Sequence, residues 1–378
     1  MHEPRRSIVL SANSDWNIAN FRGGLIRGLR KAGYEPVVIA PQDPAAEKRM
    51  RELDVERIAV PMERSGLNPL ADLALLARYR RLLKRLRPAA YLGYTIKPNI
   101  YGALAAASLG VPAIPNVSGL GTAFIRKGLL QRIVTTLYRF GFRRAPVVFF
   151  QNDEDRRLFI DRRIVRPNQT RLLQGSGVDL ERFAPTPPAE GPPIFLLVGR
   201  LLRDKGVVEF MDAARMLREE LPNARFQLLG PIDEGNRTAI NWRELDSWVA
   251  EGVVEYLGTT DDVRPFVAAA SAVVLPSYRE GMPRSLLEAA AMARPLIAAD
   301  VPGCRDVVDD GVNGYLCTVR DPASLASAMQ RLAELSLAER RAMGEAARRK
   351  VQEKFNEEFV VQAYLDVLAG LDATKPGN

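Results

Sequence analysis

The sequence of 378 residues contains very few imidazole and thiol groups. Its one histidine, His2, lies near the amino terminus, and its two cysteines are Cys304 and Cys317. Unless His2 folds inward, this excludes Ser-His-Asp and Cys-His catalytic centres, and too few soft ligands remain for a structural zinc site. We therefore predict no metal and no cofactor. The low cysteine content is typical of a reducing compartment.

Acidic residues are also missing from one long stretch. None occurs between Asp72 and Asp153, whereas thirteen lysines and arginines do. Residues 1–188 carry a net charge of +15 and the remaining residues −7. Such a positive field attracts polyanions, which could be nucleic acid, an anionic membrane surface or a phosphorylated substrate.

The sequence also lacks an uninterrupted hydrophobic run long enough to span a membrane. Residues 98–125 are free of charge, but four glycines and three prolines divide them into shorter pieces. We interpret these pieces as a buried helix, a strand and a glycine-rich loop rather than a membrane span. The amino terminus has too short an apolar patch for a signal peptide. These features predict a cytosolic or peripheral protein.

Short apolar, β-branched runs alternate with segments of helical periodicity, which predicts parallel sheets with crossover helices. The expected strands are residues 7–13, 36–40, 57–61, 90–94, 113–117, 147–151 and 171–174, followed by 194–200, 225–229, 253–257, 272–276, 295–299 and 314–317. The predicted fold class is α/β, with two Rossmann-like doubly wound domains facing an inter-domain cleft. Ligands of such sheets bind at the carboxyl ends of the strands.

A proline-rich stretch divides the chain. Residues 185–193 read PTPPAEGPP, which continues neither a helix nor a central strand. We therefore predict an acceptor-binding domain over 1–184, a linker over 185–193 and a nucleotide-sugar-binding domain over 194–355. Residues 356–378 are expected to form a helix that crosses back to the first domain, followed by a disordered tail.

One strand-loop-helix segment carries much of the predicted chemistry. Pro283 is placed as the first residue of a helix through Ala293, and the early amides of that helix form an anion site. Glu280 lies beside this site, where its carboxylate would repel phosphate unless it served another part of the ligand. Glu288 lies on the second turn and could grip hydroxyl groups. The alternative for Glu288 is a solvated acid at a helix start.

Two cations follow the first expected strand of the second half. Arg200 comes at the end of this strand and Lys205 comes just before a helix. They provide a forked donor and a point charge for a diphosphate. Two solvated surface cations are the alternative.

These motifs resemble a known family. The pattern Gly199-Arg200-(x4)-Lys205-Gly206 followed by Glu280-(x7)-Glu288 is similar to that of retaining glycosyltransferases of family 4, which have the GT-B architecture. The resemblance implies that Arg200 and Lys205 bind the donor diphosphate, that Glu280 contacts the transferred sugar as the catalytic residue, and that Glu288 holds the ribose. The remaining diphosphate contacts are assigned to Gly281, Met282, Pro283, Arg284 and Ser285.

Further segments narrow the resemblance. They are residues 16–22, 94–99, 116–122 and 281–285, and they are similar to bacterial transferases that add N-acetylgalactosamine to undecaprenyl-diphospho-bacillosamine and to O-antigen and capsule transferases. This implies a UDP-sugar donor and a polyprenyl-diphosphate-linked acceptor. The acceptor contacts expected on these segments are Arg22, Lys97, Asn99, Ser118 and Gly119.

Two segments mix bulky apolar residues with arginines, namely residues 76–86 and 129–144. Either could dock on an anionic membrane, which would make the enzyme peripheral on the inner face of the cytoplasmic membrane. The alternative is a core-facing stripe with snorkelling arginines.

The chain also departs from the family. The first-domain histidine of many members is absent, and no glycine lies between Ser11 and Asn20. Asp153-Glu154-Asp155 has the form of a metal-binding D-x-D motif, but it directly follows a strand, and we expect it to cap the next helix.

The sequence predicts a metal-independent retaining glycosyltransferase that moves a hexose or N-acetylhexosamine from a UDP-sugar to a polyprenyl-diphosphate-linked saccharide. A GT-B-like UDP-sugar epimerase is the alternative, and the scarcity of acid/base groups in the first half argues against it. A nucleic-acid-binding protein suits the charge, but no signature motif supports it, and we expect no nucleic-acid partner.

Overall fold

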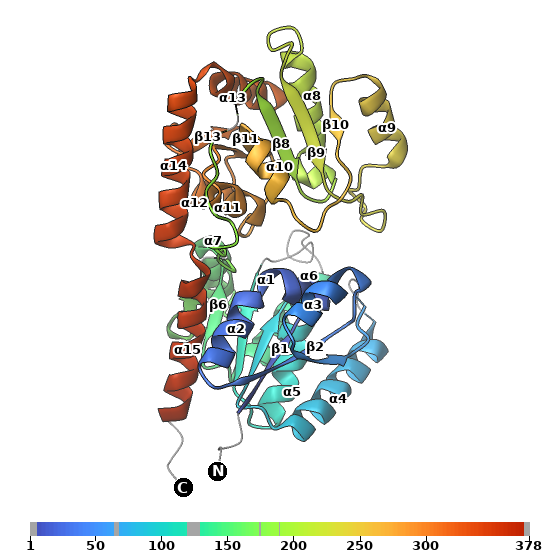
Figure 1. Ribbon diagram of the computed structural model, residues 1–378. Helices are drawn as coiled ribbons and strands as arrows, with labels where there is room; N and C mark the ends of the chain where they lie inside the picture. The colour runs from blue at the N-terminus through green and yellow to red at the C-terminus, as the bar shows by residue number, and fades with distance from the viewer. Residues whose placement is uncertain (1–5, 64–67, 119–128, 174, 189, 374–378) are drawn as a thin grey trace. The chain divides into compact units, whose positions relative to one another are not determined.

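Two parallel β-sheets organise the computed structural model, one in each of two units (Figure 1). The structure describes residues 6–63, 68–118, 129–173, 175–188 and 190–373. The first unit comprises Met1–Ser176 and Glu357–Asn378, and the second comprises Gly177–Asn356. The first unit is therefore discontinuous in sequence.

The sheet of the first unit has seven strands in the order β3-β2-β1-β4-β5-β6-β7. Their bounds are β1 Ser7–Ser11, β2 Glu35–Ala40, β3 Glu56–Ala59, β4 Ala90–Tyr94, β5 Ala113–Val117, β6 Val148–Phe150 and β7 Thr170–Leu172. Every pairing is parallel, and Val9 lies opposite Val37 on one side and Tyr91 on the other. The order reverses between β1 and β4, which makes these neighbours the topological switch point.

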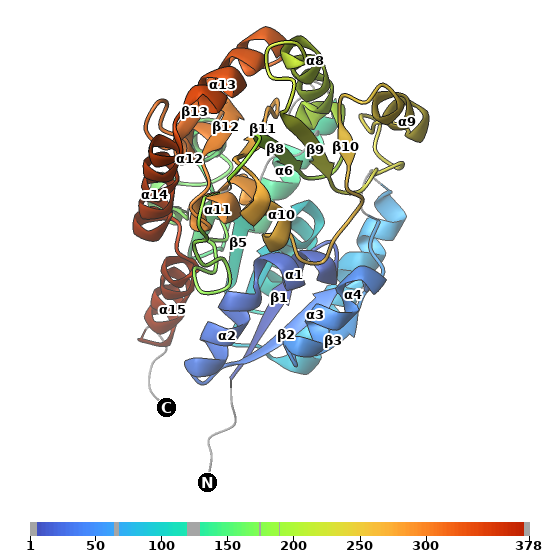
Figure 2. The ribbon, with the colours of Figure 1, turned by 45° about the horizontal axis from the view of Figure 1, so that its top comes forward.

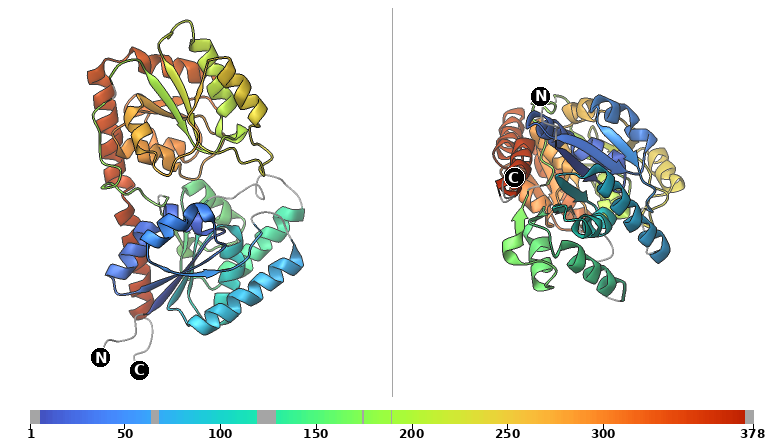
Figure 3. Two further views of the ribbon diagram at one scale, coloured as in Figure 1. Left: turned by 45° about the vertical axis from the view of Figure 1, so that its right-hand side comes forward. Right: turned by 90° about the horizontal axis from the view of Figure 1, so that it is seen from below.

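Helices cover both faces of this sheet. They are α1 Asp15–Phe21, α2 Gly23–Lys31, α3 Glu47–Glu52, α4 Pro69–Leu86, α5 Ala103–Ser108, α6 Leu129–Phe142, α7 Asp153–Asp161 and α15 Glu357–Ala373, with short turns at Pro44–Ala46, Pro98–Gly102 and Pro167–Gln169. Side chains of β1 alternate between two cores: Val9 packs with α4–α7, and Ile8 and Leu10 pack with α1, α2, α3 and α15. The left view of Figure 3 shows α4, α5 and α6 along one face.

Helix α15 completes the core of the first unit, although it comes from the end of the chain. Val360, Tyr364 and Leu368 are buried in it. The Tyr364 ring lies 4.8 Å from that of Phe149, and its hydroxyl accepts a hydrogen bond from Asn116 Nδ2 at 3.1 Å. The helix runs beside α2 (Figure 1).

The second sheet has six strands in the order β10-β9-β8-β11-β12-β13. Their bounds are β8 Ile194–Val198, β9 Arg225–Leu229, β10 Glu255–Tyr256, β11 Ala272–Leu275, β12 Leu296–Ala299 and β13 Gly314–Cys317. Here the order reverses between β8 and β11. The helices are α8 Val207–Leu217, α9 Trp242–Ala250, α10 Arg264–Ala269, α11 Arg284–Ala291, α12 Cys304–Val307, α13 Pro322–Glu334 and α14 Leu337–Lys354. Figure 2 shows α8 and α13 side by side.

The predicted alternation is confirmed, since each of the thirteen expected strands has a counterpart among the described residues. The expected linker differs. Residues 186 and 187 belong to the second unit, where the buried Arg294 side chain donates hydrogen bonds to the carbonyl groups of Thr186 and Pro187. Burial lowers the pKa of Arg294 to about 10. The chain instead passes between the units at Ser176/Gly177 and Asn356/Glu357, and α15 is assigned to the first unit.

No helix in the described ranges combines the length and the apolar character needed to cross a bilayer. His2 and the expected disordered tail beyond Ala373 lie outside the described residues.

Candidate active site

The second unit brings two loops together at the carboxyl ends of β8 and β11, its topological switch point. The loop after β8 carries Arg200 and the 3-10 turn η5 (Arg203–Lys205), and it ends at Gly206, which precedes α8. Gly206 has φ +74°, and a Cβ atom there would lie 2.2 Å from the carbonyl oxygen of Pro276 on the other loop. Only glycine permits this close approach.

Lys205 and Glu280 form an ion pair across the two loops. The ammonium of Lys205 donates to Oε1 of Glu280, and the two side chains are 25% and 11% exposed. Residues separated by 75 positions in the sequence therefore lie side by side. The pair is half-buried, so solvent screens it less than it would an ion pair on the open surface.

Backbone contacts fix the register of the loops. The carbonyl oxygen of Asp204 accepts hydrogen bonds from the amide of Tyr278 at 2.9 Å and from the hydroxyl of Ser277 at 3.1 Å. Ser277 is fully buried, so its hydroxyl requires such a partner. Nothing in the local sequence pattern predicted this contact.

Helix α11 starts directly after the second loop. Pro283 is the N-cap with φ −78° and ψ 103°, and the first helical residue is Arg284. The prediction that Pro283 opens the helix was therefore wrong by one position, because its ψ is extended. The amides of Arg284 and Ser285 belong to the first turn, which has no intrahelical acceptor for them.

Glu288 also has a partner. Its Oε1 accepts from Nε of Arg284 at 2.7 Å, one helical turn away, and its side chain is 14% exposed. The alternative of a solvated helix-start acid does not fit this burial. Ser285 is half-buried, and Met282 packs against the core of the second unit.

Gly281 lies against a third loop. Gly303, which precedes α12, has φ +81°, and a Cβ atom there would lie 2.5 Å from the carbonyl oxygen of Gly281. The next residue, Cys304, is fully buried. Burial raises the pKa of its thiol well above the ordinary value, an effect to which the Glu280 carboxylate adds, so a thiolate nucleophile is disfavoured here.

Arg200 is paired with a residue that the sequence analysis missed. Its Nη1 lies 2.8 Å from Oδ2 of Asp233, and the side chains are 54% and 35% exposed. Asp233 follows β9, whose carboxyl end adjoins that of β8. Its place after a strand was a signal that could have identified it.

The expected acceptor residues lie near the carboxyl ends of β1, β4 and β5 in the first unit. Arg22 is 3% exposed, and its guanidinium lies 4.1 Å from the centre of the Tyr94 ring. Asn99 is 1% exposed and donates from Nδ2 to the Asn116 carbonyl at 2.8 Å. Ser118 is half-buried just after β5. Gly119 lies outside the described residues.

Lys97 is neutralised by a residue that sequence reasoning did not select. Its Nζ lies 2.8 Å from Oδ1 of Asp72 on α4, whose Oδ2 accepts from the Tyr101 hydroxyl at 3.0 Å. Asp72 is 4% exposed. The nearby Thr95 has φ +63°, an uncommon backbone conformation for a β-branched residue.

The D-x-D motif begins α7. Its N-cap is Asn152, which accepts from the Asp155 amide at 2.8 Å, so the acids occupy the first turn instead of capping the helix themselves. Asp153 pairs with Arg156 and Arg157. Within the described part of the chain, no three His, Cys, Asp or Glu side chains gather as metal ligands would.

Comparison with known proteins identifies the family. The profile of the "Glycosyl transferase 4-like domain" matches residues 18–202, and that of "Glycosyl transferases group 1" matches residues 192–334. The chain belongs to the glycosyltransferase family whose two domains these profiles describe. It is an enzyme of the hexosyltransferase class, as the resemblance in the sequence implied.

Two curated relatives match most of the chain. The N,N'-diacetylbacillosaminyl-diphospho-undecaprenol alpha-1,3-N-acetylgalactosaminyltransferase of Campylobacter jejuni is 28% identical over 92% of this chain and 94% of its own. The UDP-Gal:alpha-D-GlcNAc-diphosphoundecaprenol alpha-1,3-galactosyltransferase of Escherichia coli is 25% identical over 74% of this chain and 75% of its own.

Solved structures confirm the GT-B fold. Anabaena HepE in complex with UDP and glucose superposes with a TM-score of 0.81 at 18% identity, covering 97% of this chain and 100% of that one. Sucrose-phosphate synthase from Thermosynechococcus elongatus superposes with a TM-score of 0.77 at 21% identity, covering 98% of this chain and 100% of that one.

Proposed function

We propose that this glycosyltransferase is a retaining enzyme that moves a hexose or N-acetylhexosamine from a UDP-sugar to a polyprenyl-diphosphate-linked saccharide. The two curated relatives support this proposal, because their names specify diphospho-undecaprenol acceptors. The complexes of HepE with UDP support a UDP-sugar donor.

The Lys205–Glu280 pair carries the proposal. A diphosphate that reaches Lys205 would also meet Arg200 on the same loop and the first-turn amides of α11 on the other. Negative charge grows on the leaving phosphate as the anomeric bond breaks, and these fixed positive groups stabilise it. Arg200 and Lys205 supply the positive charge that a metal ion would otherwise provide.

Glu280 and Glu288 take the sugar parts of the donor. Glu280 lies within hydrogen-bonding reach of Lys205, so it can contact the transferred sugar next to the phosphate that binds the lysine. Glu288 would bind the ribose hydroxyls. Attack from the same face as the departing phosphate accounts for retention, since it requires no covalent intermediate on the protein.

The acceptor side is assigned to the first unit. Arg22, Lys97, Asn99 and Ser118 are described near the carboxyl ends of its strands, where ligands of such sheets bind. Arg22 is buried and Lys97 is paired with Asp72, so neither offers a free charge. We therefore propose that this region contacts the acceptor saccharide through hydrogen bonds from polar groups.

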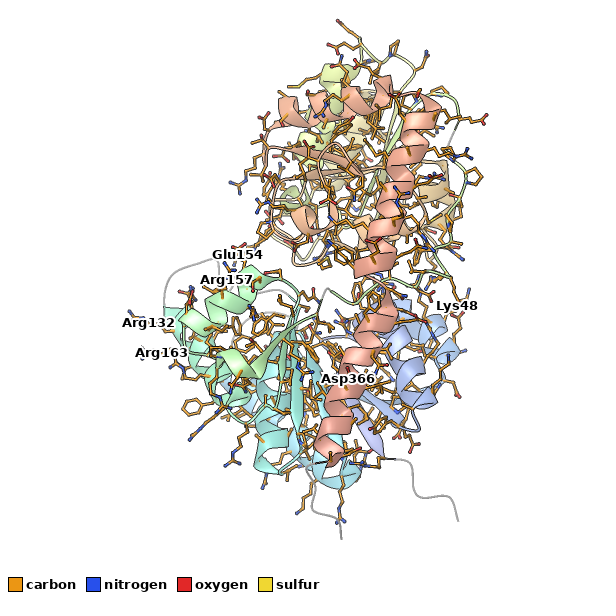
Figure 4. All side chains as sticks on the ribbon, turned by 90° about the vertical axis from the view of Figure 1, so that its left-hand side faces the viewer. Lys48, Arg132, Glu154, Arg157, Arg163 and Asp366 are labelled. Atoms are coloured by element: carbon orange, nitrogen blue, oxygen red, sulfur yellow. The ribbon has the colours of Figure 1, made fainter. Side chains whose placement is uncertain are left out.

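We propose that α6 docks the enzyme on the anionic inner face of the cytoplasmic membrane. Ile133 and Phe140 are 41% and 58% exposed, one above the other at a spacing of two turns. Arg132, Arg139, Arg143 and Arg144 are exposed around them. Figure 4 shows Arg132 and Arg163 projecting from the outer side of this unit.

Helix α4 differs from α6 in this respect. Between residues 76 and 86 its leucines are buried or half-buried, and the exposed positions are cationic or alanine. Residues 76–86 therefore match the alternative of a core-facing stripe. Leu70 and Leu73, which precede this segment near the start of α4, are 81% and 63% exposed.

An epimerase is not favoured, because the curated relatives are transferases. The test is to incubate the purified protein with a panel of UDP-sugars and polyprenyl-diphosphate-linked saccharides, with and without a chelator. We expect acceptor-dependent UDP release with one donor, unaffected by chelation, and an α-linked product by NMR. Interconversion of free UDP-sugars without an acceptor, or an inverted product, would contradict the proposal.

A further inference from the structure

A buried carboxylate lies next to the two loops of the active site. Glu209 belongs to the first turn of α8 and is 8% exposed. Its Oε1 accepts a hydrogen bond from the Tyr278 hydroxyl at 2.7 Å, whereas Oε2 is buried and has no hydrogen-bond partner among the described residues. Burying an incompletely bonded carboxylate costs stability, so solvation at a helix start does not explain this residue.

Tyr278 is held by three separate elements. Its hydroxyl is bound by Glu209 on α8, and its amide by the Asp204 carbonyl in η5. The guanidinium of Arg320, in the loop after β13, lies 4.3 Å from the centre of its ring. Burial, together with the Glu209 carboxylate, raises the pKa of Tyr278 to about 12, so the hydroxyl keeps its proton as a donor.

Glu280 lies two residues beyond this fixed point. Two residues of extended chain span at most about 7 Å, so the position of Tyr278 restricts where the Glu280 carboxylate can lie. The hydroxyl contact also holds the loop to α8, which starts directly after Lys205 and Gly206.

We propose that Tyr278, anchored on Glu209, is a positioning residue that keeps Glu280 in its reactive place when the donor diphosphate takes over Lys205. This inference rests on the proposed function. In the ion pair described here, Lys205 itself holds Glu280. A phosphate that binds Lys205 removes that restraint, and the Tyr278–Glu209 contact supplies another that the donor does not disturb. Catalytic groups must stay within about 0.5 Å of their productive geometry, so losing the anchor lowers turnover more than donor binding.

The first experiment compares Tyr278→Phe with the wild type. Losing a hydrogen bond to a charged group is expected to lower kcat about tenfold, with the donor KM changed less than about twofold. Amide hydrogen exchange of residues 277–283 is expected to accelerate with UDP bound, while β8 and β11 keep their protection. Tyr34→Phe is the matched control, because it also removes a contact between a tyrosine hydroxyl and a carboxylate, that of Tyr34 with Asp372 at 3.3 Å. Tyr34 directly precedes β2, so this contact lies at the amino-terminal end of a strand of the first unit.

Glu209 variants separate positioning from general stability. Glu209→Ala is expected to match Tyr278→Phe, and Glu209→Gln to recover most of the lost turnover, because its amide oxygen still accepts from the hydroxyl. The double variant Tyr278→Phe/Glu209→Ala is expected to be no slower than either single variant. Additive losses in the double variant, wild-type kcat in Tyr278→Phe, or a loss matched by Tyr34→Phe would each overturn the inference.

The two proposals fail in different ways. A wild-type enzyme that releases no UDP from any donor defeats the proposed function. Hydrogen exchange still tests the anchor in that case, with UDP or without it. Equal exchange of residues 277–283 in Tyr278→Phe and the wild type would overturn the anchor even if the transferase activity is established.

Discussion

Each unit places a lysine–carboxylate pair near its switch point, and the two pairs differ in burial. Lys97 and Asp72 in the first unit have side chains 11% and 5% exposed, and the Tyr101 hydroxyl also binds the carboxylate. Lys205 and Glu280 in the second unit are 25% and 11% exposed and join two loops. A pair enclosed by further hydrogen bonds stabilises the fold, whereas a more open pair between loops can exchange its partner for a ligand. The comparison contrasts a cation enclosed by the fold with the cation that we propose binds the donor diphosphate.

The largest expected effect is on turnover in the second unit. Glu280→Ala and Lys205→Ala are each expected to lower kcat/KM by about 10²–10³-fold, because each removes a group that we propose acts at the reacting centre. The free energy of unfolding should change little. Steady-state kinetics and urea unfolding check this, with Glu251→Ala as a control that breaks the Arg215–Glu251 pair elsewhere in the unit. Near-normal activity in both variants would defeat the site assignment.

Asp72→Ala should lower the free energy of unfolding more than it lowers kcat/KM, the reverse of the result expected for the Glu280 and Lys205 variants. It removes the 2.8 Å partner of the Lys97 ammonium and leaves the longer 3.8 Å contact with Glu63, so the loss of stability is expected to be up to about 3–5 kcal/mol, the cost of breaking a buried pair. Urea unfolding measures this loss, and Glu47→Ala, which breaks the more exposed pair with Arg57, is the control, with a much smaller expected effect. A stable Asp72→Ala protein with strongly reduced activity would reverse the distinction between the two pairs.

Membrane binding should depend on the first unit alone. Phe140→Asp is expected to weaken binding to vesicles containing phosphatidylglycerol by about tenfold or more, since a buried phenylalanine contributes about 1.5–3 kcal/mol. Met216→Asp changes a similarly exposed apolar side chain on α8 of the second unit and should have no effect. Vesicle co-sedimentation with neutral and anionic lipids measures both. Equal losses in the two variants would contradict docking through α6.

The smallest effect concerns Arg200. Asp233→Asn removes its carboxylate partner, so Arg200 becomes more available to a diphosphate. Exposed pairs contribute about 0.2–1 kcal/mol, which corresponds to a decrease of up to about fivefold in the donor KM. Kinetics at varied UDP-sugar concentration test this, and Asp262→Asn, which frees Arg264 in the same unit, is the control. A raised KM would show that Asp233 orients Arg200 instead of competing for it.

Much of the fold was predictable because the strand pattern is local. Buried β-branched runs such as residues 194–198 and 272–275 are continuous in the sequence, and each formed a strand. The placement of Glu280 and Lys205 in the loops after two strands was also predictable from the sequence. Their contact was not, because it depends on the close approach of Gly206 to Pro276.

Other features could not be predicted from local patterns. Asp72 and Lys97 are 25 residues apart, and only the packing of α4 on the sheet brings them together. The proline-rich stretch resembled a linker because its five prolines have no amide donor, but a cation far along the chain, Arg294, binds the carbonyl groups of Thr186 and Pro187. The contact between Glu209 and Tyr278 was missed for the same reason, since it joins positions 69 residues apart.

The position of α15 determines when the first unit can fold during synthesis. The first 176 residues supply all seven strands of its sheet, yet Val360, Tyr364 and Leu368 complete one of its cores only after the whole second unit has been translated. At about 5–20 residues per second, the ribosome leaves that apolar face uncovered for roughly ten seconds or more. A circular permutant that begins with α15 would close the core at once, and it should aggregate less during expression.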